Sequence, residues 1–199
     1  MRSAPVIADD EFDLWVRFKL GDRMAFSNMY ERYAGILYNY GFHFSNDAHI
    51  VEDAIQDLFV TLWHSRERLS DTTSIKYYLF RSLRRAIVKL SGKEQAFDRS
   101  SDYLFERVSV DSVEMQIVSG EQETEQRQHL QTALAALTPR QLEAIRLHYY
   151  EGFDVGRIAS IMEMNEQSVR NILQRSLYKL RHMMPFFPLI LSFFETSGL

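Results

Sequence analysis

The sequence has no cysteine, and only four of its 199 residues are proline and eight are glycine. The lack of cysteine excludes disulfides, thiol catalysis and cysteine-ligated metal sites. Proline and glycine together have about half their usual share of a soluble protein, and no proline lies between Val6 and Thr138. An all-β chain of this length would need many turns, which draw on these residues. We therefore predict an all-α fold.

Long apolar runs are also missing. No run reaches the roughly 18 residues of a membrane span, and the first residues lack the apolar core of a secretion signal. The six histidines show no metal-ligand spacing, and there is no glycine-rich phosphate loop or nucleophile elbow. We expect a cytoplasmic protein that is not an enzyme and uses no cofactor, no metal and no small-molecule substrate.

The net charge of −4 taken alone argues against nucleic acid as a partner, but the charge is unevenly placed. Residues 1–97 hold 13 basic and 13 acidic residues, 98–137 hold 3 and 8, and 138–199 hold 7 and 6. Two stretches, Thr72–Lys93 and Gln167–Phe194, contain basic residues and no acidic ones. Such local potential matters more to a phosphate backbone than the sum does.

The acidic middle is polar and has no sustained hydrophobic period, whereas both flanks are strongly periodic. We interpret 98–124 as a flexible acidic linker that joins two small helical domains, 1–97 and 125–184. The alternative is an ordinary acidic surface loop. The chain ends in a hydrophobic tail, 185–199. This tail either packs onto the second domain, offers a surface to a partner, or contacts a membrane.

Four helices are expected in the first domain, over residues 11–20, 22–43, 47–68 and 74–90, with Asp22 capping the second. The third has a clean apolar stripe and an acidic face, which composition alone would leave as solvated surface. The fourth has a basic face, with Lys76 and Tyr77 at its start. Cations with interleaved aromatics suit melted DNA, although a surface helix that is merely basic is the alternative. The basic face is formed by Arg81, Arg84, Arg85 and Lys89.

Three helices are expected in the second domain. Thr138 should cap the first, with Pro139 at its first position and its end near Gly152. Asp154 and Asn165 should cap the next two, which form a helix-turn-helix. The last helix presents arginine, asparagine and glutamine outward, and these groups hydrogen-bond base edges in a major groove. A helical hairpin that does not bind DNA is the alternative.

These stretches together resemble one family. VEDAIQDLFVTLWHSRERL resembles region 2.2 of extracytoplasmic-function (ECF) sigma factors of the sigma-70 family, and SIKYYLFRSLRRAIVKL resembles regions 2.3 and 2.4. LTPRQLEAIRLHYYEGFDVGRIASIMEMNEQSVRNILQRSLYKLR resembles region 4. The order, the missing region 3 and the linker match as well, over about residues 10–95 and 125–184. The general character resembles factors of Bacteroidetes-type bacteria.

The resemblance implies a sigma factor that binds core RNA polymerase, through its β′ clamp helices and β flap, and directs promoter-specific transcription initiation. Promoter DNA and an anti-sigma factor are the other implied partners. The residues that match the clamp-helix motif are Glu52, Asp53, Gln56 and Asp57. The residues that match the minus-ten reading and melting regions are Ser70, Asp71, Thr72, Thr73, Ser74, Lys76, Tyr77, Arg81, Arg84, Arg85 and Lys89. The residues that match the minus-thirty-five recognition helix are Gln167, Ser168, Arg170, Asn171, Gln174 and Arg175.

The sequence departs from the family pattern at several positions. Arg85 stands where the family often has asparagine, and Lys89 where it has aspartate. Glu163 replaces the glycine of the region 4 turn, where a left-handed backbone costs something like 1 kcal/mol. A second hypothesis is a helix-turn-helix regulator whose N-terminal half senses a signal or dimerises.

Overall fold

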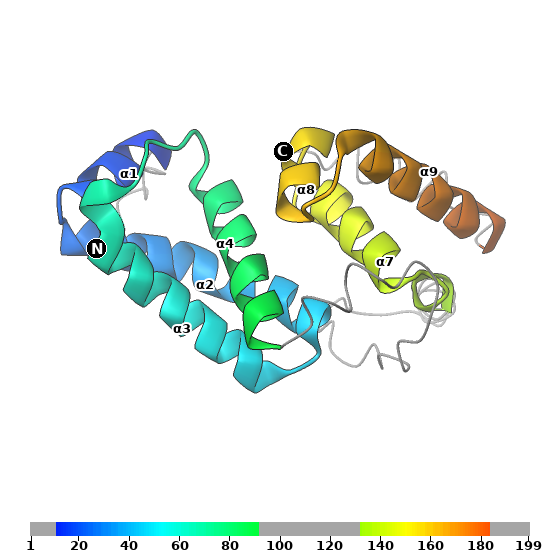
Figure 1. Cartoon of the computed structure of the whole chain (residues 1–199), viewed down its shortest axis with the longest axis horizontal. Coiled ribbons are helices and arrows are strands. Elements are labelled where there is room, and N and C mark those ends of the chain that lie inside the picture. Colours follow the sequence, from blue (N-terminus) through cyan, green and yellow to red (C-terminus); the bar gives the residue numbers. More distant parts are fainter. Residues whose placement is uncertain (1–10, 92–131, 184–199) are drawn as a thin grey trace, which may run out of the picture. The chain divides into compact units, whose positions relative to one another are not determined.

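The computed structural model of the chain describes residues 11–91 and 132–183 (Figure 1). Every regular element within these two ranges is a helix, which confirms the predicted all-α fold. The chain divides into two compact units, Met1–Ser101 and Asp102–Leu199, and each is described by itself. The predicted acidic linker and hydrophobic tail lie outside the described residues.

The first unit is a helical bundle. Its three longer helices all contact one another, and α1 packs on α2 and touches η1 (Figure 1). The four expected helices are present, with ends within two residues of the prediction, the third being completed by a short 3₁₀ turn. The elements are α1 (Glu11–Lys19), α2 (Arg23–Ser45), α3 (Ala48–Ser65), η1 (Arg66–Arg68) and α4 (Ile75–Leu90).

Side-chain caps begin the helices of this bundle. An Asp22 carboxylate oxygen accepts from the backbone N–H groups of Met24 (2.8 Å) and Ala25 (3.3 Å), which confirms the predicted cap. Asp47 caps α3 in the same way, and the Ser74 hydroxyl accepts from the Tyr77 N–H at the start of α4. These caps satisfy N–H groups that have no partner within the helix.

The glutamate that opens α1 fastens it to two other helices. One Glu11 oxygen accepts from the Tyr33 hydroxyl of α2 (2.5 Å), and the other accepts from the Ile75 N–H at the start of α4 (3.1 Å). Burial, together with the hydrogen bond to Glu11, raises the pKa of the Tyr33 phenol above its ordinary value. Trp15 of α1 is fully buried and donates to the Ser70 carbonyl (3.3 Å). The short helix α1 therefore holds the entrance to α4 in place.

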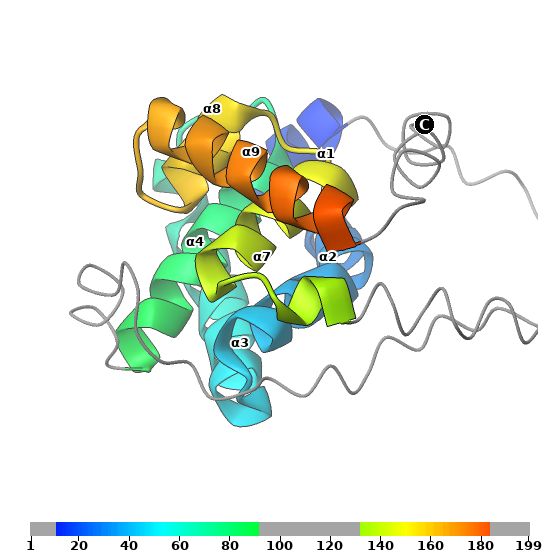
Figure 2. The ribbon, with the colours of Figure 1, turned by 90° about the vertical axis from the view of Figure 1, so that its right-hand side faces the viewer.

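Within residues 132–183, the main helices of the second unit are α7 (Pro139–Ile145), α8 (Val155–Ile161) and α9 (Glu166–Met183). In α7, the predicted cap is a full capping box, in which the Thr138 and Gln141 side chains each bond to the other's backbone N–H. The helix continues as a wider turn, η2 (Arg146–Tyr150), where the Glu151 N–H reaches back to the Arg146 carbonyl. Figure 2 shows α9 in front of α7, and α9 contacts both α7 and α8.

A helix-turn-helix is formed by α8 and α9, as predicted. Asp154 accepts from the Arg157 N–H (2.8 Å), and Asn165 accepts from the Ser168 N–H (2.7 Å), so both predicted caps are confirmed. Ala159 is buried where the two helices meet. Glu163 has φ of 55°, which confirms the left-handed turn expected at this position. The other side chains of this pair of helices that are buried are Ile158, Ile161, Met162, Val169, Leu173, Ser176 and Leu180.

Candidate polymerase and DNA interfaces

The clamp-helix motif forms one exposed face of α3. The spacing of one, three and four residues brings its members to one side of the helix, opposite an apolar stripe that is buried in the bundle. All four members are exposed: Glu52, Asp53, Gln56 and Asp57. The buried stripe is formed by Val51, Ala54, Ile55, Leu58, Phe59 and Leu62. The interior thus holds the acidic face in a fixed position.

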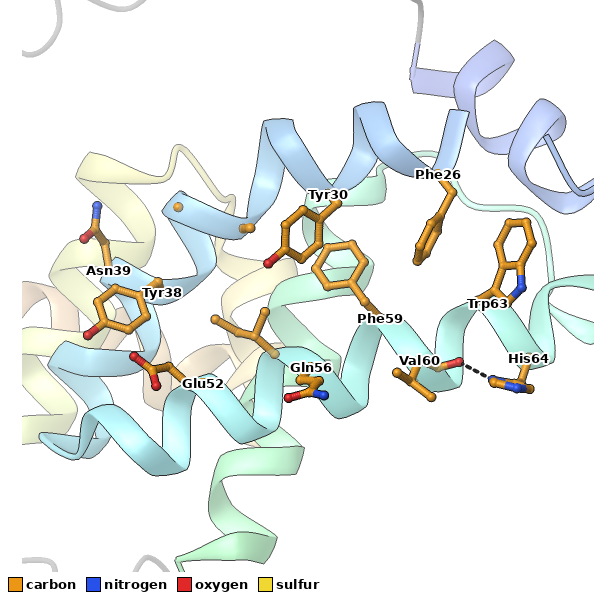
Figure 3. Close-up of a pocket in the computed structure, with 13 residues that line it drawn as sticks. Phe26, Tyr30, Tyr38, Asn39, Glu52, Gln56, Phe59, Val60, Trp63 and His64 are labelled. Carbon is orange, nitrogen blue, oxygen red and sulfur yellow. Dashed lines mark hydrogen bonds between the residues drawn. The ribbon is translucent and has the colours of Figure 1, made fainter. Parts of the chain in front are cut away.

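A groove of about 810 Å³ runs between α2 and α3 beside this face (Figure 3). Its lining is mostly apolar and aromatic, and the Tyr30 and Phe59 rings meet edge to face at 5.0 Å. Glu52 and Gln56 of the motif also line it. Tyr30 is 49% exposed because its ring stands in this open groove. The aromatic side chains in the lining are Phe26, Tyr30, Tyr38, Phe59 and Trp63.

The groove itself was not predicted. The four-residue spacing of Phe26 and Tyr30 on α2, and of Phe59 and Trp63 on α3, was visible in the sequence. Such spacing places two rings on one side of each helix, but it does not say that the two sides face each other across an open gap. The packing of α2 beside α3 in the structure shows that the two sides line one groove.

The loop from Ser70 to Ser74 joins η1 to α4 and is tied down at several points. Lys19 of α1 forms an ion pair of 2.6 Å with Asp71. The Thr72 hydroxyl donates to the Ser74 carbonyl (3.0 Å) and accepts from the Ser74 N–H (3.2 Å). Ser70, Asp71 and Thr73 are exposed, Thr72 is half-buried, and Ser74 is buried as the cap of α4. The loop therefore presents three side chains outward from a defined backbone.

The basic residues of α4 do not all share one exposed face, which corrects the prediction. Arg85 and Lys89 are exposed and Arg81 is half-buried, but Arg84 is only 5% exposed. The Arg84 guanidinium lies 5.1 Å from the ring centre of Phe44 on α2, because this edge of α4 is turned toward α2. Lys76 and Tyr77, in the first turn, are half-buried, and the Lys76 ammonium lies 5.7 Å from the Phe80 ring centre.

The recognition face of α9 lies opposite its buried side. Ser168 is half-buried, and the other five predicted members are exposed: Gln167, Arg170, Asn171, Gln174 and Arg175. Two pairs form along this face. Arg170 is ion-paired with Glu166 at 2.6 Å, and the Gln167 amide donates to the Asn171 side-chain oxygen at 3.1 Å. Sequence reasoning did not single out Glu166, although its i,i+4 spacing to Arg170 was visible.

Clusters of metal-ligating side chains and membrane-spanning helices were sought in the described residues. Within 11–91 and 132–183, no three side chains of the metal-ligating types are grouped closely enough to hold an ion. No helix in the same ranges combines the length and the apolar character that a bilayer span requires. The arrangement instead offers hydrogen-bond donors, cations and aromatic faces, which are suited to binding.

Comparison with known proteins decides the family. Residues 29–96 match the model of Sigma-70 region 2, and residues 127–180 match the model of Sigma-70, region 4. The chain is 23% identical over 161 residues to the ECF RNA polymerase sigma factor SigM of Bacillus subtilis (strain 168), covering 79% of this chain and 94% of SigM. The chain belongs to the ECF sigma factors of the sigma-70 family. It is also 22% identical over 160 residues to the ECF RNA polymerase sigma factor SigK of Mycobacterium sp. (strain KMS), covering 79% of this chain and 82% of SigK.

Solved structures show that other proteins share the fold of this sigma factor. The structure of CnrH in complex with the cytosolic domain of CnrY has a TM-score of 0.58 at 18% identity, covering 88% of this chain and 97% of CnrH. RpoE of Bartonella quintana, solved with the anti-sigma factor NepR, has a TM-score of 0.56 at 19% identity, covering 79% of this chain and 95% of RpoE.

The protein is therefore an RNA polymerase sigma factor for promoter-specific transcription. The region 2 match favours this function over a helix-turn-helix regulator with a sensing or dimerisation domain.

Proposed function

We propose that this sigma factor docks on the β′ clamp helices of core RNA polymerase through the exposed face of α3 and the groove beside it. The observation that carries the proposal is the position of the four motif side chains, which are all exposed on the helix that also lines the aromatic groove. An apolar groove with an acidic edge suits a partner helix that has apolar and basic side chains. The second unit would contact the β flap.

The loop from Ser70 to Ser74 and the start of α4 would read and open the minus-ten element. Opening a base pair costs a few kcal/mol of unstacking. A captured base held on Tyr77, with Lys76 beside it, would offset this cost, since base–aromatic stacking contributes about 1–3 kcal/mol. The exposed cations Arg85 and Lys89 would bind phosphates. This function is performed by binding in the cytoplasm, without covalent catalysis.

The exposed face of α9 would read the minus-thirty-five element as duplex DNA. Arg170 and Gln174 are one helical turn apart and carry donors that fit base edges. The domains would divide this work as predicted, with 1–97 for polymerase and the minus-ten element and 125–184 for the upstream element.

We also propose that an anti-sigma factor controls this protein. The support is that two proteins of the same fold, CnrH and RpoE, were solved with a bound partner. The hydrophobic tail, 185–199, lies outside the described residues, and its role in packing, in binding a partner or in contacting a membrane stays a prediction.

Reconstituted transcription with core polymerase tests the docking proposal. The variant Asp53→Ala with Asp57→Ala removes two exposed carboxylates from α3, and we expect weaker capture of core polymerase and fewer transcripts. The control is Asp13→Ala, which removes an exposed carboxylate from α1. If the α3 variant binds core polymerase as tightly as the control does, the docking surface is wrongly assigned. If the unaltered protein does not bind core polymerase at all, the whole proposal fails.

A further inference from the structure

A glutamate at the start of the recognition helix holds one of the proposed DNA-reading side chains. Glu166 is the first residue of α9, and one of its carboxylate oxygens accepts from the terminal nitrogen Nη2 of Arg170 at 2.6 Å. Both side chains are about half exposed, at 54% for Glu166 and 53% for Arg170. The pair therefore stands on the surface that would face DNA.

The ion pair has little value for stability. Exposed i,i+4 pairs contribute little to stability, because water screens the charges and two long side chains lose freedom. A carboxylate on a DNA-binding face is also unfavourable toward phosphates by simple charge repulsion. Glu166 also lies in the first turn of α9, where a carboxylate interacts favourably with the helix N-terminus. Neither that interaction nor attraction to DNA requires the contact with Arg170, so the effect of Glu166 on this arginine needs its own account.

The geometry shows what that effect is. A guanidinium has five N–H donors in a rigid planar fork, and Glu166 accepts from only the Nη2 group. The other donors stay available to guanine, which arginine binds through two parallel hydrogen bonds. Because one side of the fork is occupied, the arginine keeps fewer orientations before it meets DNA, and less freedom is lost on binding.

The neighbouring helix leaves room for this carboxylate. A Cβ at Gly156 of α8 would lie 3.5 Å from the Glu166 Oε1 atom and 3.3 Å from an Asp154 oxygen. A Cβ at position 156 would therefore be in ordinary van der Waals contact with the Glu166 carboxylate, so the backbone of α8 lies beside this glutamate.

We propose that Glu166 is a positioning residue that sets the base preference of Arg170 in the upstream promoter element. This inference rests on the proposed reading of duplex DNA by α9. Glu166 itself does not need to touch a base, since it acts by limiting how Arg170 approaches one.

The test uses holoenzyme formed from the full chain and core polymerase, with selection from promoters whose upstream element is randomised. Arg170→Ala identifies the base pair that the arginine reads. We expect Glu166→Gln to lower the preference for guanine at the same base pair by about twofold, because an exposed pair orders the arginine only modestly. Glu166→Asp keeps the charge but withdraws the carboxylate by one methylene group, so it should lower that preference too. Circular dichroism checks that the variants remain helical.

The control is Glu163→Gln, which removes the same charge from the exposed turn before α9 and should leave base preference unchanged. A uniform rise in affinity for all sequences with Glu166→Gln, without a change in preference, would overturn the inference, because the carboxylate would then only repel phosphate. Retained preference with Glu166→Asp would also overturn it. If Arg170→Ala changes no base preference, the proposed role of α9 itself fails and the inference fails with it.

Discussion

Single residues of this sigma factor separate into those that face a partner and those that hold the fold, and the basic side chains of α4 show the division. Arg84 and Arg85 are neighbours in sequence, yet Arg84 is buried over Phe44 while Arg85 is exposed. The sequence showed that both are basic, but it did not show which one turns toward α2. That distinction comes from Phe44, which belongs to another helix.

We predict that Arg84→Met lowers the stability of the protein, whereas Arg85→Met weakens the salt dependence of promoter binding. The first should lower the free energy of unfolding by about 1–3 kcal/mol, as typical losses of buried interactions do, and leave the salt dependence of promoter binding unchanged. The second should change the free energy of unfolding by no more than about 0.5 kcal/mol. It should lower the slope of log affinity against log salt concentration by about 1, as the loss of one phosphate contact does. Urea denaturation and binding titrations at several salt concentrations measure both. If Arg84→Met instead weakens the salt dependence of binding and leaves stability unchanged, Arg84 binds DNA.

The phenol of Tyr33 leads to a prediction on pH. Because burial and the Glu11 hydrogen bond raise its pKa in the folded state, the neutral phenol is favoured by folding. The resulting stabilisation is complete below the ordinary tyrosine pKa of about 10 and is lost as the pH rises above it. Tyr33→Phe should be less sensitive to alkali than the unaltered protein, as measured by the unfolding midpoint between pH 9 and 11. Equal alkaline sensitivity of the two proteins would contradict this account.

At the scale of elements, the sequence predicted the helices well because their caps are local. Asp22, Thr138, Asp154 and Asn165 accept from N–H groups two or three residues away, so nearby sequence is sufficient to identify them. The wider turn of η2 and the groove between α2 and α3 were not predicted. Both depend on how helices pack, and hydrophobic spacing alone does not reveal that.

The capping box of α7 should carry a measurable part of the stability of the second unit. Thr138→Ala removes the acceptor for the Gln141 N–H and should lower the free energy of unfolding of this unit by about 1 kcal/mol. The Gln141 side-chain oxygen also accepts from the Lys179 ammonium of α9 (3.2 Å), so Gln141→Ala should be at least as damaging. Gln174→Ala, at an exposed position of α9, is the control within the same unit. Equal midpoints for Thr138→Ala and Gln174→Ala would show that the cap contributes nothing.

At the scale of the whole molecule, two units share one chain, and the two tryptophans report on only one of them. Trp15 and Trp63 both belong to the first unit, whereas helical circular dichroism reports on both units. We expect Thr138→Ala to shift the circular dichroism transition while the tryptophan fluorescence transition keeps its midpoint. A parallel shift of both signals would mean that the units unfold as one.

The fastening of α1 by Glu11 sets a practical limit on shortening the protein. Because this one carboxylate bonds to both Tyr33 and the first N–H of α4, a fragment that begins at residue 12 would lose both of these hydrogen bonds while keeping nearly all of the buried surface of α1. A fragment that begins at residue 10 keeps it. The first unit prepared for biochemistry should therefore start before Glu11, and a tag placed upstream of that residue leaves the fastening intact.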